Sequence, residues 1–219
     1  MAASSSVETH PSNIRKDPLT GIRVIMAAGR NKRVGDFQEG LEVKATTPLD
    51  CPFCPGHESM TPPEIRRFPP NSPLSDWKIR VVPNKHAAML VEGKSTPDDK
   101  HRVNYQIIAA RGAHEVGIMT PDHFLNLATM GADQLALNIE AIYLREQDLY
   151  HNVSGIEGIQ AWINYGKQAG ATLYHSHWQL ICLPINANLD VIYVTTTFRD
   201  DNRYTIFEKI LEEATNDEL

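Results

Sequence analysis

The sequence has little of several features that would assign it to a class of protein. No apolar run approaches the roughly 20 residues that span a bilayer, so a membrane protein is not expected. Acidic residues outnumber basic ones by 27 to 21, whereas proteins that bind nucleic acids or anionic membranes usually present a basic surface. The opening stretch, MAASSSVETHPSN, lacks the charged and apolar regions of a secretory signal. Small anionic ligands stay compatible with this composition, because arginine clusters can hold phosphate on an acidic protein.

Cysteine is also scarce. The three cysteines form one close pair, Cys51 and Cys54, and a single residue, Cys182, inside an apolar run. This pattern excludes a disulfide scaffold and favours a reducing, cytoplasmic location.

Local patterns predict one main domain. Residues 1–13 are serine-rich and are predicted to be a disordered tail, residues 14–185 to be the domain, and residues 186–219 to be a partly helical C-terminal extension. Thr120 and Pro121 supply a cap and a first-turn proline, and apolar spacing from there to about Gln147 predicts one long amphipathic helix. Short apolar runs predict strands within 22–29, 76–85, 87–93, 104–112, 158–166 and 177–184. This order predicts an α+β fold with a mostly antiparallel sheet and one long helix packed on it.

The strand that begins HSHWQ carries the strongest functional signal. Because side chains alternate along a strand, His175, His177 and Gln179 point to one face, and Trp178 packs on the other. Two such histidines can be ordinary polar residues at a sheet edge. The preceding small-residue loop, NYGKQAGAT, favours a phosphate site, since its backbone N–H groups can approach phosphate oxygens closely. A neutral imidazole beside such a loop is a usable nucleophile toward phosphorus.

This block resembles the galactose-1-phosphate uridylyltransferase branch of the histidine-triad superfamily. The matching positions are Asn164, Gly166, Gly170, Thr172, His175, His177 and Gln179. The resemblance implies a histidine-triad-like half-barrel in which His177 is the nucleophile. In triad hydrolases a third histidine, which can protonate a poor leaving group, stands where this chain has Gln179. An amide has no proton to give, so Gln179 suits nucleotidyl transfer between phosphates.

Cys51-Pro-Phe-Cys54 is compatible with a redox pair, a zinc half-site or two unrelated thiols. The prolines at 52 and 55 and Gly56 favour a knuckle, which suits a metal, and a half-site needs two further ligands, such as histidines. The resemblance implies that these are His114 and His175, which would complete a structural Zn²⁺ site. His57 is the main rival ligand. Four other histidines are predicted to be solvated or packed: His86, His101, His123 and His151.

Two further segments support the resemblance. IRKDPLTGIRVIMAAGRNKRVGDF is similar to the family's opening segment, which implies that Arg30 and Arg33 offset substrate phosphate charge. A solvated basic loop is the alternative for these arginines. RVVPNKHAAM is similar to the segment that contacts the nucleoside, which places Asn84 at the contacting position.

The resemblance covers residues 13–185, the first half of a typical family member. It implies a nucleotidyltransferase, similar to UDP-glucose–hexose-1-phosphate uridylyltransferase or to a nucleotide-sugar phosphorylase. Such an enzyme moves a nucleoside monophosphate from a nucleotide sugar to hexose 1-phosphate or inorganic phosphate through a nucleotidyl-histidine. A homodimer is expected, because family sites are built across subunits. The alternatives are a non-catalytic, zinc-stabilised nucleotide-binding protein and a triad-type nucleotide hydrolase.

Overall fold

The computed structural model describes residues 12–16, 22–27, 47–91 and 107–185. Three parts of the sequence prediction lie outside these ranges: the site residues Arg30 and Arg33, the tail (residues 1–13) up to residue 11, and the extension from residue 186 onward. The described elements are β1 (Asn13–Lys16), β2 (Arg23–Met26), η2 (Glu58–Met60), β3 (Arg66–Phe68), β4 (Ile79–Pro83), β5 (Ile107–Ala109), β6 (His114–Ile118), α1 (Ala132–Asn152), β7 (Gly158–Ile163), η3 (Lys167–Ala169) and β8 (His177–Leu183).

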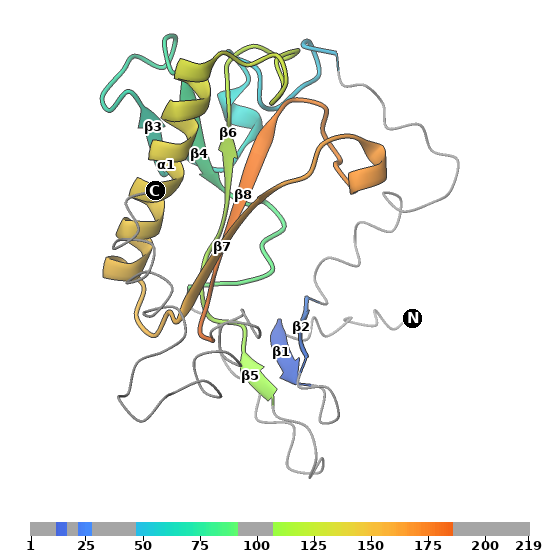
Figure 1. The fold of residues 1–219 in the computed structure, drawn as a ribbon, viewed down its shortest axis with the longest axis vertical. Coiled ribbons are helices and arrows are strands. Elements are labelled where there is room, and N and C mark those ends of the chain that lie inside the picture. The colour runs from blue at the N-terminus through green and yellow to red at the C-terminus, as the bar shows by residue number, and fades with distance from the viewer. Residues whose placement is uncertain (1–11, 17–21, 28–46, 92–106, 186–219) are drawn as a thin grey trace, which may run out of the picture. The chain divides into compact units, whose positions relative to one another are not determined.

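The strands form two open antiparallel sheets (Figure 1). The smaller sheet has the order β2-β1-β5, and the larger has the order β3-β4-β6-β8-β7. Every pairing between neighbouring strands is antiparallel, in both sheets. The predicted α+β class, with antiparallel sheets and one long helix, is therefore confirmed.

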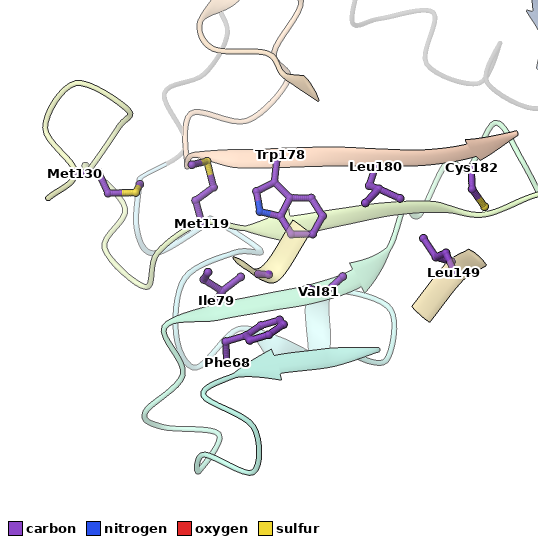
Figure 2. Close-up of a cluster of buried hydrophobic side chains, with 10 residues drawn as sticks. Phe68, Ile79, Val81, Met119, Met130, Leu149, Trp178, Leu180 and Cys182 are labelled. Carbon is purple, nitrogen blue, oxygen red and sulfur yellow. The ribbon is translucent and has the colours of Figure 1, made fainter. Parts of the chain in front are cut away.

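One face of the five-stranded sheet makes the main hydrophobic core. Trp178, Leu180 and Cys182 alternate along β8 and are fully buried, beside Ile79 and Val81 of β4. Figure 2 shows these side chains projecting from β8 and β4, the strands on either side of β6, into one layer with Leu149 of α1. Burying each large apolar side chain contributes about 1.5–3 kcal/mol, so this layer is a main source of stability.

A buried ion pair joins α1 to the same face of the sheet. Arg145 donates from Nε to Glu115 Oε2 at 2.9 Å and from Nη2 to Glu115 Oε1 at 2.7 Å. Asp148, one turn further along α1, pairs with Nη1 of the same guanidinium. Both Arg145 and Glu115 are buried, and the bidentate geometry is what makes two desolvated charges tolerable there. The pair fixes how α1 sits over β6.

The predicted start of the helix is wrong. The helix begins at Ala132, after Gly131, and not at Thr120. The Thr120 hydroxyl and the Asp122 carboxylate each accept from a backbone N–H two residues ahead, at 3.1 Å and 2.8 Å, and so close two successive turns. The helix-start signals thus serve a turn-rich loop, since short polar side chains cap turns as well as helices.

The apolar face predicted for the helix needs a second correction. Ile139 and Tyr143, two of the apolar residues whose spacing predicted the helix, are 70% and 57% exposed. The buried positions of α1 are Asn138, Ala141, Arg145 and Leu149, and Leu135 and Ile142 of the predicted apolar set pack partly buried against the same core. Polar Asn138 belongs there because it donates to the Met119 carbonyl at 2.9 Å and accepts from the Trp178 indole at 3.2 Å.

The strand predictions succeed in part. Strands occur within five of the six predicted ranges, at β2, β4, β5, β7 and β8, although the structure describes the ranges around β2 and β5 only in part. Residues 87–91, also predicted as strand, make only an isolated bridge from Leu90 to Arg111. Three strands were not anticipated, namely β1, β3 and β6. No helix in the described ranges has the length and apolar character needed to cross a membrane.

Gly117, at the centre of β6, provides the space for the indole of Trp178. A Cβ at this position would lie 1.9 Å from Trp178 Cε2, which is far inside contact distance, and the indole is fully buried. We therefore expect Gly117→Ala to lower the free energy of unfolding by about 1–3 kcal/mol or more, through overpacking. Thermal unfolding followed by circular dichroism measures the change.

Gly131→Ser is the matched control. Its new side chain enters open space at the N-cap of α1, where serine is favoured over most residues. An unchanged or raised melting temperature is expected for this variant. Equal melting temperatures for Gly117→Ala and the wild type would contradict the packing described for Trp178.

Candidate active site

The opposite face of the five-stranded sheet carries a pocket of about 430 Å³. His177 and Gln179 of β8 reach this face because they alternate with the core residues Trp178 and Leu180. Six of the predicted site residues line the pocket: Asn84, Asn164, Gly170, Thr172, His177 and Gln179. Strand alternation and the loop before β8 therefore bring together residues that are 95 positions apart in the sequence.

The His177 imidazole is held in one tautomer. Its Nδ1 lies 2.9 Å from the carbonyl oxygen of His175, which can only accept, so Nδ1 carries the proton. In the neutral ring Nε2 therefore keeps its lone pair. Burial lowers the pKa of His177, which favours the neutral form. The ring packs edge-on against Phe53, with centroids 5.3 Å apart. The arrangement meets the requirements for a nitrogen nucleophile at neutral pH.

The loop before β8 supplies one wall of the pocket. Gly166 and Gly170 have positive φ angles of 77° and 74°, which are favourable for glycine, and the Ala171 N–H donates to the Gly166 carbonyl at 3.1 Å. These turns bring Gly170, Ala171 and Thr172 to the rim of the pocket beside His177. Small residues and backbone N–H groups there are compatible with a phosphate.

A second group of side chains, called here the metal group, lies next to residues that line the pocket. Cys51, Cys54, His123 and His175 are all buried, and their ligand atoms lie within 4.8 Å of one another. Nδ1 of His175 lies 3.6 Å from the Sγ atoms of both cysteines, and Nδ1 of His123 lies 3.3 Å from Sγ of Cys54. A tetrahedral ion with metal–sulfur distances of about 2.3 Å and metal–nitrogen distances of about 2.1 Å needs S–N separations of about 3.6 Å. The group fits a metal ion.

The protonation chemistry of this group also fits a metal ion. Burial lowers the pKa of His175 to about 4, and its Nε2 lies 2.8 Å from the Thr120 carbonyl, so Nδ1 is left as a lone pair facing the thiols. Burial and the neighbouring Cys51 raise the pKa of Cys54 to about 12 when no cation is present. Two thiolates can therefore coexist in this buried place only with a cation between them.

His123 takes the position that the sequence prediction gave to His114, and this is a correction. His114 is not in the cluster: it lies on β6, where Nδ1 accepts from the Ala88 N–H at 3.1 Å and Nε2 lies 3.1 Å from Gln179 Oε1. The turns at Thr120 and Asp122 place His123 beside Cys54. The rival His57 is also outside the cluster, with Nδ1 2.8 Å from the Cys51 carbonyl.

The sequence analysis also missed residues of the pocket wall. Pro52 and Phe53, between the two cysteines, line the pocket, and so do Met60, Thr61 and Pro62 from the proline-rich segment that follows. Their only signal in the sequence is their place within and just after the Cys51–Cys54 pair. The knuckle thus links the metal group to the surface that contacts His177.

Comparisons with known proteins decide the family. A family model described as the N-terminal domain of galactose-1-phosphate uridyl transferase matches residues 3–186. The chain belongs to this family. It is 32% identical over 181 residues to ADP-glucose phosphorylase from Arabidopsis thaliana, covering 82% of this chain and 51% of that protein. It is 25% identical over 185 residues to galactose-1-phosphate uridylyltransferase from Saccharomyces cerevisiae, covering 78% of this chain and 48% of that protein.

Solved structures in the family share the fold. A crystal structure of an Arabidopsis thaliana ADP-glucose phosphorylase with bound ADP-glucose aligns with a TM-score of 0.52 and 29% identity, over 78% of this chain and 48% of that one. A uridylyltransferase structure aligns with a TM-score of 0.56 and 24% identity, over 83% of this chain and 50% of that one. The chain therefore spans about half the length of the relatives that it matches.

The two candidate fourth ligands can be separated by substitution. His123→Ala should lower metal affinity by at least about tenfold, since it removes an atom from the cluster, whereas His114→Ala should retain the metal. The measurement is metal per chain by inductively coupled plasma mass spectrometry after desalting, with about one ion expected in the wild type. Loss of the metal in His114→Ala, with retention in His123→Ala, would instead support the ligand set predicted from the sequence.

Proposed function

We propose that this chain transfers a nucleoside monophosphate from a nucleotide sugar to a phosphate acceptor through a covalent intermediate on His177. The observation that carries the proposal is the setting of the His177 ring: the His175 carbonyl fixes its Nδ1, and the ring lines a pocket large enough for a small ligand. Membership of a nucleotidyltransferase family supports the reaction class.

The first step forms one bond and breaks one. The Nε2 lone pair of His177 attacks the α-phosphorus of the nucleoside diphosphate sugar, and the bond from that phosphorus to the bridging oxygen breaks. Sugar 1-phosphate leaves with the electron pair and needs no added proton, because a phosphate is a stable anion. The ring then carries phosphorus on Nε2, a proton on Nδ1 and a positive charge. The His175 carbonyl, which accepts from Nδ1, stabilises that charge.

The second step returns the enzyme to its starting state. An oxygen of the acceptor phosphate attacks the same phosphorus, the nitrogen–phosphorus bond breaks, and Nε2 regains its lone pair. Gln179, Gly170 and Thr172 are proposed to donate to the phosphoryl oxygens as charge develops on them. Asn84 and Asn164 are proposed to contact the nucleotide, and Arg30 and Arg33 to offset phosphate charge. An amide at position 179 also argues against a triad-type hydrolase, because it cannot protonate a leaving group.

The first substrates to test follow from the comparisons. Identity to the plant ADP-glucose phosphorylase, at 32%, is higher than to the yeast uridylyltransferase, at 25%. ADP-glucose with inorganic phosphate is therefore the proposed pair. UDP-glucose with hexose 1-phosphate is the rival pair.

The metal is proposed to be Zn²⁺, held by Cys51, Cys54, His123 and His175. Two thiolates and two imidazoles are a donor set that zinc prefers, and four protein ligands leave no position for a reactive water. The role of the ion is therefore structural. It would hold the Cys51–Cys54 knuckle, and with it Phe53, against the His177 ring.

Residues 14–185 are proposed to be the catalytic domain, with a second copy of the chain supplying further walls of the site in a homodimer. One observation fits a different function as well: the pocket beside His177 is large enough to bind a small ligand without any transfer step. A non-catalytic protein that binds nucleotides through the same pocket is therefore the second candidate.

Intact-mass spectrometry tests the proposal. The full chain mixed with ADP-glucose, and separately with UDP-glucose, should gain the mass of one nucleoside monophosphate. The adduct should disappear on adding inorganic phosphate or hexose 1-phosphate. His177→Ala should form none, and His151→Ala, at the exposed end of α1, should form it as the wild type does.

Absence of any adduct, together with calorimetric binding of nucleoside monophosphate, would support the second candidate. An adduct that persists in His177→Ala would place the nucleophile elsewhere.

A further inference from the structure

His114 is a buried histidine beside the pocket, and the metal group does not use it. It lies on β6 next to β8, where His114 pairs with Ile181 and Val116 pairs with Gln179. His114 and Gln179 are therefore diagonal neighbours on the same face of the sheet. The indole of Trp162 lies against the imidazole, with ring centroids 5.8 Å apart.

Backbone donors fix the direction of the hydrogen bonds that join His114 and Asn84 to Gln179. The Ala88 N–H donates to His114 Nδ1 at 3.1 Å, so in the neutral ring the proton is on Nε2. The His86 N–H donates to Asn84 Oδ1 at 2.9 Å, so the other end of that amide is the NH₂ group. His114 and Asn84 therefore both present N–H groups.

Both of these donors converge on one atom. His114 Nε2 lies 3.1 Å from Gln179 Oε1, and Asn84 Nδ2 lies 3.3 Å from the same oxygen. The two nitrogens are 3.1 Å apart because they share this acceptor. Since both lone pairs of Oε1 are engaged, the Gln179 amide has one favourable orientation, and its NH₂ group is the end left for a ligand. Among the described residues, the hydrogen bonds of the Gln179 side chain are made by Oε1, and none is donated by its NH₂ group.

We propose that His114 is a positioning residue that, together with Asn84, holds Gln179 with its NH₂ group toward the phosphoryl oxygens of the substrate. The inference rests on the proposed function, in which those oxygens gain charge beside His177. A flipped amide would turn its oxygen toward the phosphate and repel it. The two donors, His114 and Asn84, thus ensure that Gln179 presents an N–H group to the phosphate and not an oxygen. A carboxylate at position 179 would accept the same two hydrogen bonds but would add a negative charge beside the phosphate.

Two substitutions at His114 separate positioning from simple structural support. In side-chain reach, the glutamine Nε2 corresponds to histidine Nε2, and the asparagine oxygen corresponds to histidine Nδ1. His114→Gln therefore keeps a donor toward Gln179 and loses the Ala88 contact, whereas His114→Asn keeps the Ala88 contact and loses the donor. The rate of nucleotidyl-adduct formation from ADP-glucose is followed by quenched-flow mass spectrometry, and thermal unfolding is measured in parallel.

Positioning predicts that His114→Asn slows adduct formation by about 10- to 100-fold and that His114→Gln stays closer to the wild type. In a Gln179→Ala background, His114→Asn should change the rate by no more than about twofold, because the residue through which it acts is gone. Reintroducing a donor by His114→Gln should also have no effect in that background.

The opposite rank order, with His114→Asn the faster variant, would overturn the proposal and show that the Ala88 contact is what matters. Equal slowing by His114→Asn with and without Gln179 would overturn it as well. A wild-type chain that forms no adduct would instead refute the proposed function. The two failures are thus distinguishable in one set of measurements.

Discussion

The hydrogen bond from His177 Nδ1 to the His175 carbonyl is the interaction on which the site depends. It sets which nitrogen of His177 is available to the pocket, and it comes from the backbone of a residue whose own ring faces two cysteines. The ring of His175 is fixed in turn by the Thr120 carbonyl. His177 and the candidate metal group are therefore linked through one short segment, in which each of the two histidine rings is oriented by a carbonyl oxygen and both rings are buried.

The five-stranded sheet separates two kinds of polar chemistry. On the face toward α1, the buried charges of Arg145 and Glu115 pair with each other inside an apolar layer. On the other face, the polar side chains of Asn84, His177 and Gln179 line the pocket. The ion pair between Arg145 and Glu115 satisfies both of its members and stabilises the fold. Polar groups that line the pocket can instead take a ligand as a hydrogen-bond partner.

The sequence alone predicted what depends on local geometry. Alternation along β8 identified His177 and Gln179, and the Cys-x-x-Cys spacing identified half of the metal group. The choice between His114 and His123 was not predictable in this way, because it depends on turns after Thr120 that resemble a helix start. Strand β6 was missed because Glu115 and Gly117 are poor strand formers. Glu115 is needed there to pair with Arg145, and Gly117 to make room for Trp178, and both partners are distant in sequence.

The alternation of β8 has a consequence for folding. Odd-numbered residues His177 and Gln179 serve the pocket, and even-numbered Trp178 and Leu180 serve the core. A shift of this strand by one position against β6 would put an indole in the ligand cavity and imidazole under the helix. Such a misregistered chain would lose its hydrophobic core and its pocket together, so the stability of the fold and the shape of the pocket depend on the same alignment of two strands.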